Sequence, residues 1–269
     1  LIDDNFFLEG CYSKGDILKN RKLNNNPFRL ILGEKLSTKN INDLIKYNNI
    51  PIVDNKNRLI KILNRKKSKS FNIAGKDFQP YNNILTIAEI GNNHNGSVNR
   101  GLSLIKEAVR SGAKAVKFQA RKLDETYIDI SDDYLNKTDY GTSYTINQLK
   151  SFNLSQEELK ILFQKTRDLN VLLICTAFDK TSANFLIKEK VDAIKIASAD
   201  MLNYDLYDVF KYSSIPLIIS TGMHEEKDII KLSKYLIENF IPSILLQVNS
   251  TYPTPYDDVQ LNFMPSLSE

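Results

Sequence analysis

The sequence predicts an α/β fold with a parallel sheet over residues 84–269, preceded by a small α+β module. Six apolar runs of strand length alternate with helix-length segments, at residues 84–90, 115–119, 171–176, 193–197, 216–221 and 243–248. The runs are almost continuously apolar, as strands are when both faces of a parallel sheet are covered. This alternation is compatible with a (β/α) barrel or with an open doubly wound sheet.

The segments between the strands carry helix signals. Ser97 is an N-cap candidate for a helix over residues 98–111 that Gly112 would end. The Ser-Gln-Glu-Glu stretch from Ser155 is typical of a capping box. Residues 120–153 are polar and aromatic, which favours an active-site excursion over a simple connection. Further helices are predicted over residues 182–188, 204–212 and 225–240.

Two features bear on the choice between barrel and open sheet. No Gly-x-Gly-x-x-Gly follows the first strand, which disfavours a dinucleotide-binding doubly wound sheet. A complete barrel takes about 250 residues, so residues 84–269 have room for about six of its eight strand–helix units. If the fold is a barrel, we expect it to be truncated after about six strands.

The N-terminal residues 1–65 follow a different pattern. Leu1-Ile2-Asp3-Asp4 and Ile52-Val53-Asp54-Asn55 each open a strand–turn–strand pattern, which indicates a repeat of roughly 50 residues. The region is basic, since residues 1–80 hold 16 Lys and Arg against 8 Asp and Glu. No aromatic residues interleave with the basic run at residues 65–69, so we expect a solvated linker over residues 66–83 and no nucleic-acid partner.

Composition narrows the class of protein. No apolar run approaches the roughly 20 residues that cross a bilayer, and the first residues lack the features of a signal peptide. We therefore expect a cytoplasmic protein with no membrane partner. Cys11 and Cys175 lie far apart in strand-like runs and are expected to be buried free thiols.

Polar side chains stand at the C-terminal ends of the predicted strands, where ligands of parallel α/β folds bind. Lys117 and Lys195 lie within apolar strands, a costly position for an ammonium group unless it meets an anion. Nearby hydroxyl groups suit a phosphate or a carboxylate, at Thr176, Ser198 and Ser250. The pattern predicts an enzyme that acts on an anionic, phosphorylated small molecule.

Other residues near these strand ends have two interpretations. Glu89 and Asp200 could handle protons or orient a substrate, although Glu89 could also cap a neighbouring helix. The Asn92–Gly96 stretch could be a simple turn, since Asn and Gly favour positive φ. A metal-ligand role for His94 is disfavoured because no second His or Cys stands near it, and His224 is expected to be a polar loop residue.

Six motifs then stand in order over residues 84–260: Ala88-Glu89-Ile90-Gly91-Asn92-Asn93-His94-Asn95-Gly96, Val116-Lys117-Phe118-Gln119, Thr176-Ala177-Phe178, Ile194-Lys195-Ile196-Ala197-Ser198, Ser220-Thr221-Gly222-Met223 and Tyr252-Pro253-Thr254-Pro255-Tyr256. Together they resemble the N-acetylneuraminate (sialic acid) synthase family. The resemblance implies a (β/α)8 TIM-type barrel. It also implies condensation of phosphoenolpyruvate with an N-acetylated hexosamine, N-acetylmannosamine or a 2,4-diacetamido sugar, with release of phosphate.

The same resemblance implies roles by position. Glu89 and Asp200 match catalytic carboxylates, and Gln119 and Tyr252 would face the acceptor sugar. The remaining substrate-binding positions are Lys117, Thr176, Phe178, Lys195, Ser198 and Ser250. A divalent metal, usually Mn²⁺, is implied with its ligands beyond Glu269 and none in this chain, as is a homodimer at full length.

Residues 1–65 resemble part of a cystathionine-β-synthase (CBS) regulatory module. In this resemblance Ser13 and Asp16 would contact an adenine nucleotide, while a structural or dimerising module is the alternative. Two alternatives also stand for the whole chain. One is another phosphoenolpyruvate-dependent aldol-type synthase, and the other is a non-catalytic sugar- or nucleotide-binding regulatory protein.

Overall fold

The structure is a computed structural model that describes residues 30–31, 49–64, 71–78, 83–251, 253–264 and 267. The chain divides into two compact units, Leu1–Lys69 with Ser233–Phe240, and Ser70–Leu232 with Ile241–Glu269. Several predicted features lie outside the described residues: the first repeat, the basic run at residues 65–69, Cys11, Ser13, Asp16 and Tyr252.

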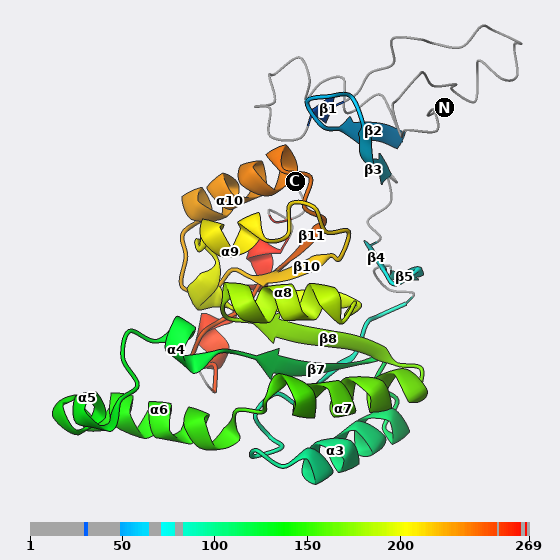
Figure 1. The fold of residues 1–269 in the computed structure, drawn as a ribbon. Coiled ribbons are helices and arrows are strands. Elements are labelled where there is room, and N and C mark those ends of the chain that lie inside the picture. The colour runs from blue at the N-terminus through cyan, green and yellow to red at the C-terminus, as the bar shows by residue number, and fades with distance from the viewer. Residues whose placement is uncertain are drawn as a thin grey trace, which may run out of the picture. The chain divides into compact units, whose positions relative to one another are not determined.

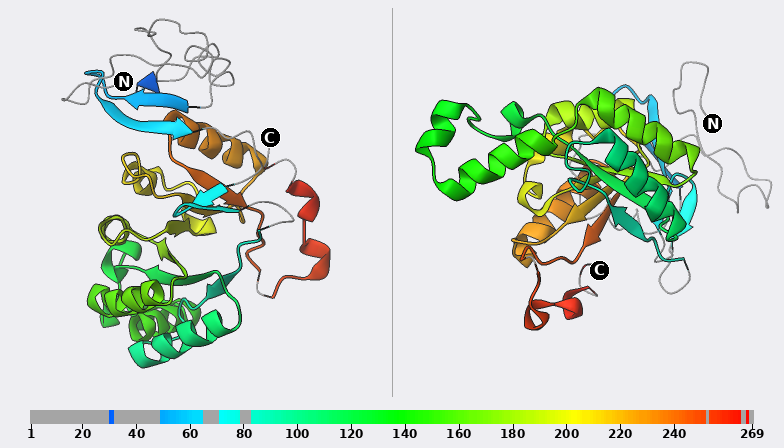
Figure 2. Two further views of the ribbon diagram at one scale, coloured as in Figure 1. Left: turned by 90° about the vertical axis from the view of Figure 1, so that its right-hand side faces the viewer. Right: turned by 90° about the horizontal axis from the view of Figure 1, so that it is seen from below.

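A six-stranded sheet forms the centre of the second unit. Its strands are β6 (Ile87–Glu89), β7 (Ala115–Ala120), β8 (Leu172–Ala177), β9 (Ala193–Ile196), β10 (Leu217–Ser220) and β11 (Ser243–Leu246). They neighbour one another in sequence order and every pairing is parallel. The sheet curls as part of a barrel does (Figure 2). Because the strand order never reverses, the doubly wound alternative is excluded.

Five helices follow the strands as the sequence predicts: α3 (Val98–Arg110), α7 (Gln156–Asp168), α8 (Lys180–Lys188), α9 (Tyr204–Asp208) and α10 (Glu226–Glu238). Ser97 caps α3 by accepting a hydrogen bond from the Arg100 backbone N–H. The predicted capping box of α7 is complete, with Ser155 and Glu158 each bonding the other's backbone N–H. Helices α3, α7 and α8 lie along one face of the sheet (Figure 1).

The excursion between β7 and α7 is helical. It contains α4 (Leu123–Thr126), α5 (Asp132–Lys137) and α6 (Tyr140–Phe152), and the α5–α6 pair extends away from the sheet (Figure 1). Its base is fixed where Gly96, at φ 72°, faces the Ser151 carbonyl. A Cβ at Gly96 would lie 2.4 Å from that oxygen. Glycine is therefore required at this close approach between the first turn and α6.

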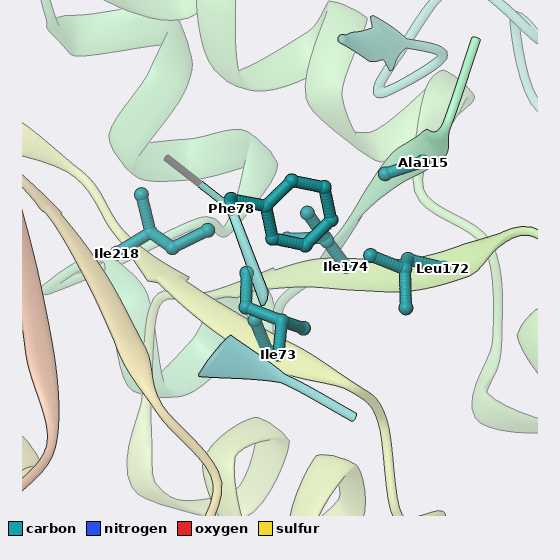
Figure 3. Packing of buried hydrophobic residues seen from close by; sticks show 7 residues of the cluster. Ile73, Phe78, Ala115, Leu172, Ile174 and Ile218 are labelled. Carbon is teal, nitrogen blue, oxygen red and sulfur yellow. The ribbon is translucent and has the colours of Figure 1, made fainter. Parts of the chain in front are cut away.

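A small hairpin closes the N-terminal end of the curled sheet. It consists of β4 (Phe71–Ile73) and β5 (Lys76–Phe78), which pair antiparallel, and it lies within the segment that the sequence assigned to a linker. Ile73 and Phe78 are fully buried against inward-facing residues of the sheet (Figure 3): Ala115, Leu172, Ile174, Ala193 and Ile218. Access for a ligand is therefore from the C-terminal ends of the strands.

The first unit contains a three-stranded sheet of β1 (Leu30–Ile31), β2 (Asn49–Val53) and β3 (Leu59–Asn64). The predicted second strand–turn–strand pattern is confirmed by the antiparallel pairing of β2 with β3. Asp54 stabilises the turn by accepting hydrogen bonds of 2.9 Å from the backbone N–H groups of Lys56 and Arg58. Such a sheet occurs in many modules, so the resemblance to a CBS module stays a prediction.

Two further predictions concern membranes and cysteine. None of the helices in the described part of the chain has the length and apolarity needed to cross a membrane. Cys175 is a buried free thiol, as predicted, and its burial raises the pKa of the thiol.

Candidate functional site

The inner face of the curled sheet changes from apolar to polar side chains along strands β7 to β10. On β7, Ala115 belongs to the apolar cluster, whereas Lys117 and Gln119 follow it at alternate positions. Strand β8 changes in the same way from Leu172 and Ile174 to Thr176, β9 from Ala193 to Lys195, and β10 from Ile218 to Ser220. Because alternate residues of a strand share a face, the polar groups all face the space above the apolar cluster.

Lys117 occupies the centre of this polar face. Its ammonium Nζ lies 2.7 Å from Glu89 Oε2 and 3.4 Å from Thr176 Oγ1. The Lys117 side chain is 9% exposed, while that of Glu89 is 60% exposed. The cation is therefore held deep in the site and the carboxylate faces the opening.

Lys195 is the second cation of the face. Its Nζ donates hydrogen bonds to Ser220 Oγ at 2.6 Å and to the Ile196 carbonyl at 2.7 Å. Burial first, and then repulsion by Lys117, lower the pKa of Lys195 to about 8, although Glu89 acts in the opposite direction. No carboxylate in the described part of the chain forms an ion pair with Lys195, so an anion placed here would stabilise its charged form.

Two hydroxyl groups converge beside Gly222, in the loop after β10. A Cβ at Gly222 would lie 2.6 Å from Ser250 Oγ and 3.0 Å from Ser198 Oγ. His224 Nε2 lies 2.8 Å from the Ser198 carbonyl and, since that oxygen can only accept, Nε2 donates. The structure thus brings the predicted Ser198 and Ser250 together and leaves little room for a side chain between them.

Gln119 and Phe178 meet at the opening through a residue that the sequence analysis did not select. Arg121 donates a hydrogen bond to Gln119 Oε1, and its guanidinium carbon lies 4.2 Å from the centre of the Phe178 ring. The Gln119 amide itself lies against Gly91. The alternation of Lys117, Gln119 and Arg121 along one strand was the signal that could have identified Arg121.

Asp200 ends the short 3₁₀ turn Ser198–Asp200 after β9. Burial raises the pKa of its carboxyl, the charge of Asp179 raises it further, and Asn203 opposes both. In the described part of the chain, no hydrogen bond or ion pair joins Asp200 to Glu89, Lys117 or Lys195. Its catalytic role stays a prediction.

The Asn92–Gly96 turn holds the backbone of Glu89 in place. Asn93 Nδ2 donates to the Glu89 carbonyl at 3.0 Å, and buried His94 accepts the Gly96 N–H on Nδ1 at 3.1 Å. Burial lowers the pKa of His94, which favours the neutral ring. The stretch is therefore a turn that also supports the site.

A divalent metal does not fit the described residues. Among them, no three His, Cys, Asp or Glu side chains gather closely enough to hold an ion. The buried His94 already uses Nδ1 within its own turn.

A cavity of about 300 Å³ lies beside the excursion and the start of α7. Its lining includes Arg121, Lys122, Asn153 and Ser155, but neither Lys117 nor Lys195. The cavity therefore shares only Arg121 with the polar face, and the two lysines lie outside its lining.

Other functional positions were only partly visible in the sequence. Ser220 was noted at a strand end, but its bond to Lys195 depends on the pairing of β9 with β10. His224 was expected to be a polar loop residue, and the structure adds its bond to Ser198. Tyr252 lies outside the described residues.

Comparisons with known proteins agree with this fold. An uncharacterized protein of Methanocaldococcus jannaschii is 37% identical over 182 residues, which cover 67% of this chain and 50% of that protein. The N,N'-diacetyllegionaminic acid synthase of Legionella pneumophila is 34% identical over 192 residues, covering 68% and 53%. The crystal structure of the N-acetylneuraminic acid (sialic acid) synthetase of Leptospira borgpetersenii, in complex with citrate, superposes with a TM-score of 0.65 at 28% identity. It covers 74% of this chain and 66% of that one.

The chain spans about half the length of the curated relatives it matches. The sequence profile of the NeuB family matches residues 104–269, which is more than half of the chain and includes strands β7 to β11. With the parallel, curled sheet and the polar strand ends described above, this match shows that the chain belongs to the NeuB family.

Proposed function

We propose that the protein is a nonulosonic acid synthase, which condenses phosphoenolpyruvate with an N-acetylated hexosamine and releases phosphate. The observation that carries the proposal is the convergence of Lys117 and Lys195 on one face of the sheet, with hydroxyl groups around both. Relatives named as sialic acid and legionaminic acid synthases support the same class of reaction.

In this proposal the two lysines and their neighbouring hydroxyls bind phosphoenolpyruvate. The ligand carries a phosphate and a carboxylate, and two ammonium groups that repel each other are stabilised by such a dianionic partner. Thr176 and Ser220 already bond the two lysines and would help to orient these groups. Ser198 and Ser250, beside Gly222, offer further hydrogen bonds to the phosphate or carboxylate oxygens.

The reaction then forms a carbon–carbon and a carbon–oxygen bond at the expense of the C2=C3 and aldehyde double bonds, and it breaks the bond from C2 to the phosphate oxygen. The C3 carbon of phosphoenolpyruvate bonds to the sugar aldehyde carbon, and the aldehyde oxygen takes up a proton. Water bonds to C2 and loses one proton, which leaves a tetrahedral C2 that carries a hydroxyl group. The C2–O bond to phosphate then breaks as this hydroxyl loses its proton, which gives the keto product and free phosphate. Glu89 faces the opening and is proposed to accept the proton from water, while Asp200, with its raised pKa, is proposed to donate to the aldehyde oxygen.

Measurement of phosphate release tests this proposal. The protein would be incubated with phosphoenolpyruvate, Mn²⁺ and a panel of N-acetylmannosamine and 2,4-diacetamido sugars, and we expect release that depends on the sugar. Glu89→Gln should abolish release while leaving phosphoenolpyruvate bound. If phosphoenolpyruvate binds but no sugar elicits release, the non-catalytic alternative is favoured. If it does not bind at all, the proposal is wrong.

A further inference from the structure

Arg121 lies between two side chains that the family resemblance assigned to the substrate, Gln119 and Phe178. It donates a hydrogen bond to Gln119 Oε1, and its guanidinium carbon lies 4.2 Å from the centre of the Phe178 ring. An aromatic face attracts a cation because the face carries partial negative charge. The guanidinium is thus held between an amide oxygen and an aromatic ring.

The backbone on both sides of the Arg121 side chain is held as well. The Arg121 carbonyl accepts a hydrogen bond from Asn153 Nδ2 at 3.1 Å, and the backbone N–H of Lys122 donates to Asp179 Oδ2 at 2.7 Å. Asp179 is itself buried and caps α8, and Asn153 ends α6. The main chain at Arg121 is therefore anchored at two points, which limits where its side chain can reach.

Arg121 is not part of a structural ion pair in the described part of the chain, since no carboxylate there bonds to its guanidinium. Its Nε is buried and makes no hydrogen bond, and burial lowers the pKa of the group. A cation removed from water without a counter-ion costs free energy, so packing alone does not account for an arginine at this position. The polar contact that its guanidinium makes is the one with Gln119.

This contact fixes which atom of the Gln119 amide faces which way. A guanidinium has donors and no acceptor, so the amide atom beside it is the oxygen. The amide nitrogen Nε2 lies on the other side, next to Gly91, where a Cβ would be 3.1 Å from it. The hydrogen bonds within the described residues leave both N–H donors of this NH₂ group unused.

We propose that Arg121 is a positioning residue, which turns the Gln119 amide so that its NH₂ group, and not its oxygen, meets the acceptor sugar. The inference rests on the proposed function, because Gln119 meets a sugar only if the acceptor lies above phosphoenolpyruvate. Gln119 then acts as a hydrogen-bond donor alone and selects an oxygen of the sugar that accepts. An amide that is free to turn binds donors and acceptors alike, whereas a fixed amide discriminates between them.

Binding of the sugar, measured by ligand-observed nuclear magnetic resonance, tests the inference without requiring turnover. N-acetylmannosamine and a 2,4-diacetamido hexose would each be titrated against the protein saturated with phosphoenolpyruvate, and the sugar that the wild type binds more tightly becomes the probe. Arg121→Met should weaken binding of the probe about three- to tenfold, because the amide is no longer held. Both sugars are uncharged, so loss of the positive charge by itself has little effect on their binding.

Variants of Gln119 separate positioning from packing. Gln119→Glu keeps the contact to Arg121 but replaces the NH₂ group by an oxygen, and should weaken binding of the probe by more than about tenfold. Gln119→Met removes the amide. Adding Arg121→Met to this variant should cause no further loss, because Arg121 acts through Gln119.

Two exchanges at arginine serve as rescue and control. Arg121→Lys retains a donor for the amide oxygen and should recover part of the affinity that Arg121→Met loses. Arg110→Met makes the same exchange at the end of α3, where Arg110 pairs with Glu107 on the surface, and should leave the affinity unchanged.

Four outcomes overturn the inference: wild-type affinity in Arg121→Met, wild-type affinity in Gln119→Glu, losses that multiply in the double variant, or a wild type that binds neither sugar. Multiplying losses would mean that Arg121 acts independently of Gln119. A titration with phosphoenolpyruvate alone reports on folding and on the proposed function. Arg121→Met should bind phosphoenolpyruvate within about threefold of the wild type, whereas a wild type that does not bind it removes the proposed function itself.

Discussion

The two ends of the curled sheet are built from the same strands but differ in chemistry: the N-terminal end is apolar and closed, and the C-terminal end is polar and open. At the N-terminal end, Ala115 and Leu172 bury Ile73 and Phe78 of the β4–β5 hairpin in a dry apolar cluster. Two to four residues further along the same strands, Lys117 and Thr176 hold unpaired hydrogen-bonding capacity for a ligand. On this inner face, residues at the start of each strand therefore stabilise the fold, and residues near the end of each strand are placed to contact a ligand.

A substitution in the apolar cluster should therefore lower the free energy of unfolding without a direct effect on ligand binding. Phe78→Ala removes a buried ring and should lower the free energy of unfolding by about 3–5 kcal/mol, measured by urea denaturation. Ile128→Ala, at a fully exposed apolar residue of the excursion, is the control and should change it by less than about 0.5 kcal/mol. A loss in Phe78→Ala no larger than in the control would contradict the packing of the hairpin.

A substitution at the polar end of the sheet should weaken the binding of phosphoenolpyruvate and leave the stability of the fold unchanged. Lys117→Met removes one of two cations and should weaken phosphoenolpyruvate binding roughly 10- to 100-fold, since a charge-assisted contact is lost. Because the substitution also removes a buried charge, stability should not fall. Lys106→Met, on the exposed side of α3, is the matched control for calorimetry. Unchanged affinity in Lys117→Met would remove this residue from the site.

The pH dependence of binding sharpens the same comparison. Lys195 has a pKa of about 8 in the ligand-free protein, so it loses its charge as pH rises through that value. Phosphoenolpyruvate affinity should therefore fall by up to about tenfold per pH unit above 8, and the slope should disappear in Lys195→Met. Titrations from pH 7 to 9.5 would measure it. If the affinity of Lys195→Met falls with pH as steeply as that of the wild type, a group other than Lys195 is responsible for the pH dependence.

Lys195 should also affect stability in this range. The lowered pKa means that the unfolded chain binds more protons at this group between about pH 8 and 10.5, so its contribution to stability rises with pH there. Binding and stability should thus change in opposite directions over the same pH range.

The smallest effect is expected beside Gly222. Gly222→Ala places a methyl group against Ser250 and Ser198, whose side chains can rotate away, so binding of phosphoenolpyruvate should weaken only about three- to tenfold. Gly141→Ala, on the exposed surface of α6, should leave affinity unchanged. Full affinity in Gly222→Ala would show that the two serines do not contact the ligand.

Much of the fold could be predicted because its signals are local. The continuous apolar runs led to all six strands of the sheet, and the Ser155 capping box led to the start of α7. The helical form of the excursion and the β4–β5 hairpin were missed. The helices of the excursion are polar and bury few apolar residues, so their periodicity is weak, and a hairpin of two three-residue strands resembles a linker until its partners are known.

The sequence by itself determined the parallel α/β class, the positions of Lys117 and Lys195 at strand ends, and the resemblance that led to the NeuB family. Only the tertiary structure decided which groups those lysines meet, because Glu89, Thr176 and Ser220 come from neighbouring strands whose register no local pattern encodes. It also decided that Arg121 continues the row of Lys117 without a carboxylate partner among the described residues. Burial and pairing are properties of the assembled sheet, so the chemistry of a strand-end residue becomes defined only when its neighbours are in place.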